Sequence, residues 1–512
     1  MEVARTRSVS LRGLEGALVE VEAHIAPGLP SFALTGLPDK ACGQAPDRVR
    51  PALASSGYPL PTRRITVNLS PAALEKHGSG FDLPIAVAVL VASGVIAQRV
   101  VGDIVHLGEL GLDGALRRIH GILPAVLHAQ AQGVRTVIVP PENLAEAQLV
   151  EGVDVHAPPN LRTLIQWYAG VAAGHDLPQS EAAAGAGRAE RLVGDLADVV
   201  GQTEARMALE LAATGGHHLA LGGPPGVGKT MLAERLVTIL PPLTREQALQ
   251  THAVASLIGA IGAVHGLDLT PPYVAPHHTA SMAALVGGGS RQVLPGAVSR
   301  AHHGVLFLDE AAEFDQRTLN TLRQPLESGE VVIARARAVH RYPARFLLVL
   351  ASNPCPCGNA YHKGRECTCS PTVIRHYRNK LNGPLLDRID LQVSVHPVTL
   401  SALEGTVGES SAVVAARVAQ GRGAAEERWA ALGYRLNAEV PGSVIRRPPY
   451  RLAARTTAGL ARLLDRGDLT MRGFDRALRV AWTVADLAGH TVPDPDDVSA
   501  ALALRHTGRL AA

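Results

Sequence analysis

Apolar and polar residues alternate with two different periods along the first third of the chain. Some stretches alternate at every second residue, as half-buried strands do, and others repeat at the spacing of a helix. The strand-like stretches include 17–25, 64–69 and 136–139, and the helix-like ones include 47–56 and 122–132. This mixture predicts one α/β domain over residues 1–170.

The last part of the chain has only the helical period. Helices are predicted at 411–422, 456–466, 471–488 and 495–505. Residues 399–512 are therefore expected to form a helical domain, with a break at Pro448 and Pro449. Residues 171–192 are rich in Ala and Gly and lack periodicity, which is typical of a linker. Residues 193–398 form the central segment.

The longest apolar run, residues 83–97, is too short for a membrane helix. It contains Pro84, Ser93 and Gly94, and a membrane-spanning helix needs about 20 apolar residues. We interpret it as a buried strand or helix. No apolar segment follows the basic N-terminus, so no signal peptide is predicted. The expectation is a cytoplasmic protein with no membrane partner, whose cysteines lie in a reducing compartment.

Composition narrows the classes of partner. The chain has 512 residues, more than one compact core accommodates, so about two to four domains are expected. Aromatic residues make up 3% of the chain, which argues against base stacking as the main mode of nucleic-acid binding. The net charge of +3 gives a weak overall field, so a nucleic-acid partner would need a local basic patch.

The strongest chemical signal is a phosphate-binding loop of the form Gly-x-x-x-x-Gly-Lys-Thr. It lies between a strand-like stretch at 218–221 and a helix-like run at 231–240, as this motif requires. Its residues are Gly223, Pro224, Pro225, Gly226, Val227, Gly228, Lys229 and Thr230. The glycines let backbone N–H groups surround phosphates at a helix N-terminus. Lys229 is expected to contact the β- and γ-phosphates of ATP, and the Thr230 hydroxyl to ligate Mg²⁺.

A second motif supplies carboxylates. Residues 305–308 are apolar and predict a buried strand, which ends in Asp309 and Glu310. Asp309 is expected to hold Mg²⁺, directly or through water, and Glu310 to orient and deprotonate the attacking water. Many strands end in this way, so the motif gains its meaning from its pairing with the phosphate loop.

Three further polar residues follow in the order found in AAA+ ATPases. Asn353 comes after a predicted strand at 346–351 and would reach between the phosphate and the water near Glu310. Arg388 is a candidate arginine finger for the nucleotide of a neighbouring subunit, and Arg472 could contact nucleotide from the C-terminal helices. A lone arginine is more often a surface ion pair, so these assignments depend on the order of the motifs.

A long insertion separates the two ATP motifs. Residues 251–300 contain the sequences Pro276-His-His-Thr279 and Gly287-Gly-Gly-Ser290. We interpret the histidine pair as part of a turn, with imidazoles that face solvent or are satisfied in the core. A metal site is the alternative.

Four of the five cysteines lie close together in the loop 355–369, as Cys355, Cys357, Cys367 and Cys369. Four thiolates complete a tetrahedral zinc site, although CxC spacing fits the usual zinc knuckle less well than CxxC. Structural Zn²⁺ is the first interpretation, free thiols the second and disulfides the third. Cys42 has no partner in the sequence and is interpreted as a small buried residue.

These motifs together resemble the ComM/YifB family, bacterial AAA+ proteins described as magnesium chelatase-like. The resemblance covers essentially the whole chain. Besides the ATP motifs and the histidine pair, it rests on Gly36-Leu-Pro-Asp39, Ile65-Thr-Val-Asn-Leu-Ser-Pro71, Phe81-Asp-Leu-Pro-Ile-Ala86, Leu285-Val-Gly-Gly-Gly289, Asn353-Pro-Cys-Pro-Cys-Gly358 and Gly383-Pro-Leu-Leu-Asp-Arg-Ile-Asp390. It implies an N-terminal Lon-like α/β domain (S5 domain 2-like), a three-layer P-loop AAA+ core and a C-terminal helical lid. It also implies ATP bound between the subunits of a hexamer, and a motor that drives branch migration of DNA recombination intermediates.

The resemblance suggests where DNA would bind. Residues 327–345 look like the hairpin that points into the central pore of such rings, where Arg335, Arg337 and Arg341 could hold DNA phosphates. Binding of this kind is sensitive to salt and tolerant of sequence. The alternative is an exposed hairpin with a solvated basic edge.

The N-terminal domain resembles the peptidase domain of Lon but lacks its reactive residues. The nucleophilic serine position falls at Pro84, and the lysine base position falls near Leu123 or Pro124. Proline and leucine cannot attack a carbonyl or take a proton. No peptidase activity is expected, and the domain is interpreted as a ring scaffold or a DNA-binding surface.

Three functions remain open at this point. A DNA motor follows from the whole-length resemblance and the basic hairpin. A metal-insertion chaperone that remodels a chelatase partner follows from the related clade only, and the Lon-like domain argues against it. A non-enzymatic scaffold is disfavoured by the intact ATP motifs. DNA-stimulated ATP hydrolysis separates the first function from the second.

Overall fold

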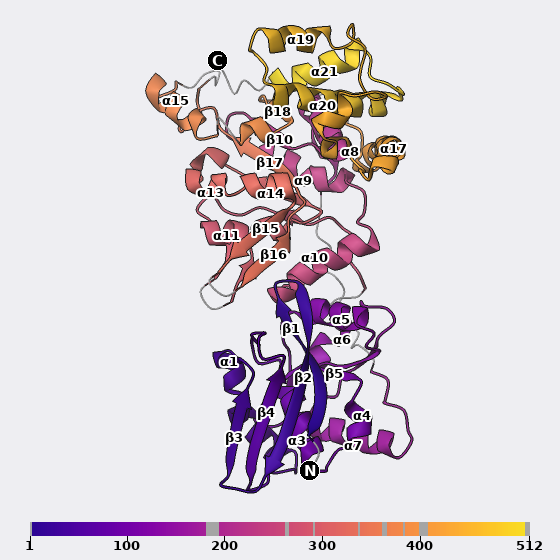
Figure 1. The fold of residues 1–512 in the computed structure, drawn as a ribbon. Coiled ribbons are helices and arrows are strands. Elements are labelled where there is room, and N and C mark those ends of the chain that lie inside the picture. Colours follow the sequence, from indigo (N-terminus) through magenta and orange to yellow (C-terminus); the bar gives the residue numbers. More distant parts are fainter. Residues whose placement is uncertain are drawn as a thin grey trace.

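The computed structural model describes residues 3–180, 194–261, 266–289, 292–335, 338–360, 366–381, 385–398 and 408–506. Figure 1 shows three parts that follow one another along a long axis. An N-terminal α/β unit occupies one end, a central α/β unit lies next to it, and a group of helices forms the other end. The α/β class with a helical C-terminus, predicted from the sequence, is confirmed.

The N-terminal unit is built on a mixed sheet with the strand order β3-β4-β2-β1-β5-β8-β9. Its strands are β1 (Ala4–Arg12), β2 (Glu15–Ala26), β3 (Ser31–Thr35), β4 (Arg64–Ser70), β5 (Ile104–His106), β8 (Thr136–Ile138) and β9 (Asp154–His156), with a small hairpin of β6 (Glu109–Leu110) and β7 (Leu116–Arg117) beside it. β2 pairs antiparallel with β1 and with β4, and the other neighbours in the sheet pair parallel.

Helices cover both faces of this sheet. They are α1 (Lys40–Gly43), α2 (Ala45–Ser55), α3 (Asp82–Ala92), α4 (Gln98–Val101), α5 (Ile122–Ala131), α6 (Leu144–Ala147) and α7 (Leu161–Ala172). Val19 and Val21 of β2 share a core with α3, whereas Leu18 packs in the core that contains α5. Neighbouring side chains on a strand point to opposite faces, so one strand can contribute to both cores.

The structure refines two sequence-based expectations for this unit, the form of the apolar run at 83–97 and the start of the linker. The apolar run at 83–97 was left open between strand and helix. Its first ten residues belong to α3, which ends at Ala92 and in which every residue from Asp82 to Leu90 is buried. A helix buried on all sides has no polar face, so its sequence lacks the usual period. α7 continues to Ala172, so the segment 171–192 begins inside a helix. Residues 181–192 of the predicted linker lie outside the described residues.

The central unit holds a parallel sheet with the order β11-β14-β17-β10-β18. Its strands are β10 (Leu219–Gly222), β11 (Tyr273–Val274), β14 (Val305–Leu308), β17 (Leu347–Ser352) and β18 (Leu391–Ser394). Its helices are α8 (Thr203–Gly215), α9 (Lys229–Ile239), α10 (Arg245–Leu257), α11 (Met282–Val286), α12 (Ala297–Arg300), α13 (Gln316–Asn320), α14 (Arg323–Ser328) and α15 (Pro371–Asn379). Two small hairpins, β12 (Gly287–Gly288) with β13 (Leu294–Pro295) and β15 (Glu330–Ala334) with β16 (Val339–Pro343), lie outside this sheet.

The C-terminal part is helical, as predicted. Its helices are α17 (Ser411–Trp429), α18 (Gly442–Ile445), α19 (Ala458–Asp465), α20 (Met471–Ala488) and α21 (Pro495–His506). Trp429 and Trp482 are buried in its core, with ring centroids 5.9 Å apart. None of the helices in the described ranges combines the length and apolarity that crossing a membrane requires.

Helix α10 connects the central unit to the N-terminal one, because it packs against α5. The backbone N–H of Gly121 donates to the Ser256 carbonyl at 3.1 Å, and that of Leu123 donates to the Ser256 hydroxyl at 3.4 Å. The Arg118 guanidinium donates to the Ile261 carbonyl at 2.6 Å. Apolar contacts accompany these hydrogen bonds, so the two units share a packed interface.

Candidate functional site

The ATP motifs meet at one edge of the central sheet. β17 lies between β10 and β14, and all three strands are parallel. The phosphate loop follows β10, the acidic pair follows β14, and Asn353 follows β17. The carboxyl ends of parallel strands form the usual ligand-binding edge of such sheets, and here they bring together motifs that are far apart in the sequence.

Lys229 is the centre of this cluster. Its Nζ donates to the carbonyl oxygens of Gly223 at 2.7 Å and Pro224 at 2.9 Å, and to Oδ1 of Asn353 at 3.0 Å. The residue is only 7% exposed. Burial lowers the pKa of the ammonium, although the nearby carboxylates of Asp309 and Glu310 partly oppose this effect. The cation is therefore held at the mouth of the loop by acceptors that a phosphate can replace.

Thr230 and Asp309 form a second contact across the same edge. The Thr230 hydroxyl donates to Oδ2 of Asp309 at 2.8 Å. A hydroxyl and a carboxylate are oxygen ligands of the kind that Mg²⁺ prefers, so the donor set fits this ion. The phosphate loop that leads to Thr230 turns at Gly226 and Gly228, whose φ angles of 80° and 90° favour glycine.

Glu310 has an unusual backbone and an unexpected partner. Its φ of 48° and ψ of 43° place a non-glycine residue in the left-handed region, which few such residues occupy. Its Oε2 lies 3.0 Å from Nδ1 of His278. The sequence had suggested a turn with solvent-facing or core-satisfied imidazoles, or a metal site, for the histidine pair. The structure instead brings one of the two histidines to the acidic motif.

A pocket opens beside the phosphate loop. Its wall includes Gly222, Gly223, Pro224, Asn353, Tyr377, Leu381, Val395 and His396. Gln202, just before α8, contacts this wall from outside the pocket, because its Nε2 donates to the His396 carbonyl at 2.6 Å. The same Nε2 donates to the Val227 carbonyl of the phosphate loop at 3.4 Å. Neither Gln202 nor His396 belongs to a contiguous motif, so no pattern in the sequence indicated that they lie near the site.

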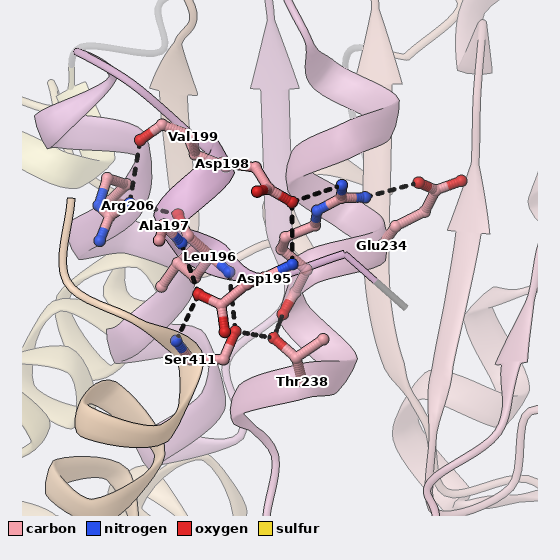
Figure 2. Close-up of polar contacts among 10 residues, drawn as sticks. Asp195, Leu196, Ala197, Asp198, Val199, Arg206, Glu234, Thr238 and Ser411 are labelled. Atoms are coloured by element: carbon pink, nitrogen blue, oxygen red, sulfur yellow. Dashed lines mark hydrogen bonds and ion pairs between the residues drawn. The ribbon is translucent and has the colours of Figure 1, made fainter. Parts of the chain in front are cut away.

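The segment before Gln202 is tied to the C-terminal helices by a polar network (Figure 2). The Asp195 carboxylate accepts from the backbone N–H groups of Ala197 at 2.7 Å and Ser411 at 2.9 Å. These two hydrogen bonds lower the pKa of Asp195. The Ser411 hydroxyl accepts from the Leu196 N–H at 2.8 Å and lies 2.6 Å from the Thr238 hydroxyl of α9. The network therefore joins the segment before α8, the helix of the phosphate loop and α17.

Arg388 and Arg472 line a second pocket, separate from the first. Its other residues are Glu327, Asp387, Asp475, Arg476 and Arg479. Arg388 forms an ion pair with Glu327, and Arg472 lies 3.6 Å from Asp387. The structure thus places the two predicted arginines together, and neither is among the residues that line the pocket beside the phosphate loop.

The four clustered cysteines face one another. Their Sγ atoms are 3.4 Å apart for Cys355 and Cys357, 3.7 Å for Cys355 and Cys367, and 3.5 Å for Cys357 and Cys367, with Cys369 in the same group. A tetrahedral zinc ion with Zn–S bonds of about 2.3 Å separates its sulfurs by roughly 3.8 Å. The cluster therefore has the dimensions of a Cys₄ zinc site. Cys42 is completely buried, as predicted.

The predicted basic hairpin is the β15–β16 pair. Arg335 donates to the Gly289 carbonyl at 2.8 Å, and Arg341 pairs with Glu330 at 2.7 Å. Both arginines are exposed, and Arg337 lies outside the described residues. The hairpin therefore contacts the β12–β13 turn through Arg335.

The residues at the Lon dyad positions are all part of the N-terminal core. Pro84 is buried in α3, and Leu123 and Pro124 are buried in α5.

Family models match most of the chain. The model of magnesium chelatase subunit ChlI matches residues 195–403, and that of the ChlI C-terminal part matches residues 408–505. A further model, of subunit ChlI of Mg-chelatase, matches residues 21–143.

Curated relatives match from end to end. Competence protein ComM of Haemophilus influenzae is 40% identical, over 100% of this chain and 99% of that protein. The uncharacterized protein YifB of Escherichia coli is 39% identical, over 100% and 98%. The chain belongs to the ComM/YifB family. An uncharacterized protein of Mycobacterium tuberculosis is 49% identical over 99% of both chains.

Membership of this family assigns a biochemical activity to the cluster around Lys229, Thr230 and Asp309. This ComM/YifB chain is an AAA+-type ATPase, and its similarity to magnesium chelatase subunits implies the use of nucleotide and Mg²⁺. A shorter similarity, 32% identity over 27% of this chain and 26% of the relative, links it to Lon protease 2 of Bacillus subtilis. The Lon-like relationship inferred from the sequence is thereby supported.

Proposed function

We propose that this protein is a ring-forming, ATP-driven DNA motor that acts on branched or single-stranded recombination intermediates. The observation that carries the ATPase part is the direct contact of Lys229 with Asn353 and of Thr230 with Asp309. The DNA part is supported by the full-length similarity to a competence protein and by the exposed arginines of the β15–β16 hairpin.

Each residue of the cluster has a role in this proposal. Lys229 binds the β- and γ-phosphates, and Thr230 and Asp309 supply oxygen ligands to Mg²⁺. Glu310 accepts a proton from water as the water oxygen bonds to the γ-phosphorus and the bond to the β-phosphate oxygen breaks, which releases ADP and phosphate. Asn353 holds the attacked phosphate in line with Glu310.

Arg388 and Arg472 complete the site of a neighbouring subunit. Both line a pocket of which no phosphate-loop residue is part, so they are suited to a nucleotide bound by another copy of the chain. Charge that builds on the phosphoryl oxygens is stabilised by such arginines. The site therefore requires an oligomer, and a hexamer is the expected ring.

DNA binds, in this proposal, through phosphate contacts of Arg335, Arg337 and Arg341. Charge-based contacts of this kind are independent of sequence and weaken steeply as salt rises. The competing interpretation is a solvated hairpin edge, and it predicts that neutral substitutions there leave DNA binding unchanged.

The remaining parts have supporting roles. We propose that residues 1–170 form a Lon-like domain without peptidase activity, 171–192 a linker, 193–398 the ATPase core and 399–512 the lid. Cys355, Cys357, Cys367 and Cys369 would hold a structural Zn²⁺, which would keep their loop closed.

The test measures the steady-state ATPase rate of the full-length protein at low and moderate salt. It is run alone and with single-stranded, duplex and four-way-junction DNA. Stimulation that fades with salt supports the motor, and branch migration is then assayed directly. Lys229→Ala should weaken ATP binding, and Glu310→Gln should bind ATP without hydrolysing it.

A second candidate, ATP-driven remodelling of a protein partner, is favoured by the match to magnesium chelatase subunit models. It predicts robust ATP hydrolysis that is indifferent to every DNA. Such a result would overturn the DNA motor.

A further inference from the structure

The loop that carries the four clustered cysteines is continuous with the ATP site. Cys355 follows two residues after Asn353, whose Oδ1 accepts from Nζ of Lys229 at 3.0 Å. Farther along the loop, Gly358 lies so close to Pro225 of the phosphate loop that an added Cβ would come within 2.7 Å of the proline ring. A change in the shape of the cysteine loop therefore reaches the phosphate-binding residues at two places.

The turn that touches Pro225 is built around a thiol. Sγ of Cys355 accepts from the Ala360 N–H at 3.3 Å, and the Cys355 carbonyl accepts from the Gly358 N–H at 3.0 Å. Gly358 has a φ of 75°, in the left-handed region that favours glycine. Covalent chemistry within the sulfur cluster therefore alters the turn that packs on the phosphate loop.

Two of these thiols are placed to oxidise as a pair. The Sγ atoms of Cys357 and Cys367 are 3.5 Å apart, and both residues are half-buried, so a small oxidant can reach them from solvent. Cysteines that ligate zinc are thiolates, and sensitivity to peroxide increases with thiolate character and exposure. A disulfide brings its sulfurs to about 2.05 Å, so the bond would draw together two residues that are ten positions apart.

Cys42 has the opposite environment. It is completely buried, and burial raises the pKa of its thiol to about 12. The thiolate is the reactive form, so a buried, protonated thiol of this kind is inert. Of the chain's five cysteines, Cys42 therefore serves as an internal reference for the selectivity of oxidation.

We infer that Cys357 and Cys367 form a reversible oxidation site for hydrogen peroxide, and that their disulfide weakens ATP binding by displacing the loop that packs on the phosphate loop. The Cys357 thiolate attacks one peroxide oxygen, the O–O bond breaks and hydroxide leaves, which gives a sulfenic acid. The Cys367 thiolate then attacks this sulfur, and a second hydroxide leaves as the S–S bond forms. The two sulfurs lose two electrons in total, and the peroxide gains them.

Oxidation also removes ligands from the proposed zinc site. Only two thiolates remain after the disulfide forms, fewer than the four of a tetrahedral Cys₄ site, so bound zinc should be released. The inference rests on the proposed function, because its consequence is measured as ATP binding at the site around Lys229. It adds sensitivity to an oxidant to a motor that the proposed function couples to DNA alone.

The experiment treats the reduced, zinc-loaded, full-length protein with hydrogen peroxide and stops the reaction with catalase. It measures the Kd for ATP by equilibrium titration, the released zinc with a chromogenic chelator, and the Cys357–Cys367 disulfide by mass spectrometry. Peroxide should raise the Kd roughly 10- to 100-fold, the scale of one hydrogen bond to a charged group. About one zinc per chain should be released, and dithiothreitol followed by zinc should restore ATP binding.

Three variants separate loop displacement from general damage. Cys42→Ser keeps the loop thiols and should respond to peroxide as the wild type does. Gly358→Ala, kept reduced, should weaken ATP binding without any oxidant, because its Cβ meets Pro225. Gly433→Ala is the matched control, because Gly433 has a φ of 77° and no atom within 4 Å of an added Cβ. Its Kd for ATP should stay within about twofold of the wild-type value.

Several results would overturn the inference. One is a Kd for ATP that stays within about twofold of the reduced value after the disulfide has formed. Others are peroxide treatment that leaves Cys357 and Cys367 unlinked or the zinc bound, a loss of affinity that dithiothreitol and zinc do not reverse, and equal effects of Gly358→Ala and Gly433→Ala. In each of these cases the reduced protein still binds ATP. Failure of the reduced wild type to bind ATP would instead overturn the proposed function, and the inference with it.

Discussion

The C-terminal helices are anchored to the ATPase core by a buried ion pair that can be broken selectively. Asp390, directly before β18, is 2% exposed and accepts from the Arg476 guanidinium of α20. Oδ2 of the same carboxylate lies 3.3 Å from Nδ1 of His217. Arg476 is one helical turn after Arg472, so this pair positions the helix that presents an arginine of the proposed intersubunit site.

The variant Arg476→Met should destabilise the C-terminal helices strongly. It leaves the Asp390 carboxylate buried without its main cation, and breaking a buried pair in this way costs about 3–5 kcal/mol. With a urea slope of about 2 kcal/mol per M, the unfolding midpoint should fall by roughly 1.5–2.5 M. Arg472→Met is the control, because the Arg472 side chain is 71% exposed and 3.6 Å from Asp387. An exposed pair contributes under about 1 kcal/mol.

Tryptophan fluorescence can follow these helices separately from the rest of the protein. The chain has three tryptophans, of which Trp429 and Trp482 are buried in the C-terminal core. Trp167 lies in α7 of the N-terminal unit, and Trp167→Phe removes its signal. An Arg476→Met midpoint within about 0.3 M of the parent, or an equal shift in Arg472→Met, would show that the pair does not anchor the C-terminal helices.

Three further outcomes are expected. Burial opposes ionisation of Asp390, but Arg476 and His217 outweigh it and hold the pKa of this carboxyl well below its usual range. The ionised carboxylate therefore stabilises the fold above the unfolded pKa of about 3.9, and this stabilisation is lost as the pH falls below that value. The urea midpoint followed by tryptophan fluorescence should fall steeply below about pH 4, and it should fall less in Asp390→Asn. Cys367→Ser should remove bound zinc, measured by metal analysis, and weaken ATP binding, measured by titration. The cysteine loop packs closely on the phosphate loop, since a Cβ at Gly358 would lie 2.7 Å from Pro225. The control variant Cys42→Ser should retain bound zinc. Arg388→Ala should abolish ATP hydrolysis while keeping ATP binding, and mixing it with Glu310→Gln should restore part of the activity if Arg388 acts on a neighbouring subunit.

The fold could be predicted where local pattern and tertiary environment agree. The apolar stretch 305–308 agrees with β14, and the helix predicted at 471–488 agrees with α20. The stretch 83–97 could not be resolved, because α3 is buried on every side and its sequence carries no polar face. The end of α7 could not be predicted either, because the helix continues through Val171 and Ala172 into a sequence rich in small residues, which had been assigned to the linker.

The candidate site could be predicted only where its residues form contiguous motifs. The proximity of Lys229, Thr230 and Asp309 was expected, because each follows an apolar strand at the spacing of a known motif. Gln202 and His278 were missed as site residues, because their proximity to the site depends on how the pocket wall and the insertion fold back onto it. The pairing of Arg388 with Arg472 likewise depends on how α20 docks beside β18, which no local pattern specifies.

The N-terminal unit contacts the core beside both elements that the proposals invoke. Ala253 and Ile261, from α10 and the turn after it, pack into the core that contains α5, and Gln250 of the same helix lies 3.1 Å from His302 and 2.9 Å from His303, just before β14. The β1–β2 turn approaches the β15–β16 hairpin, because a Cβ at Gly13 would lie 3.1 Å from the Arg341 carbonyl of β16. Removing the N-terminal unit would expose the apolar side of α10 and free one flank of β16. The N-terminal unit therefore supports the segment that leads to Asp309 and Glu310, and it also supports the β15–β16 hairpin. This support is a structural role for a Lon-like domain in which Pro84 and Leu123 stand where reactive residues would be needed.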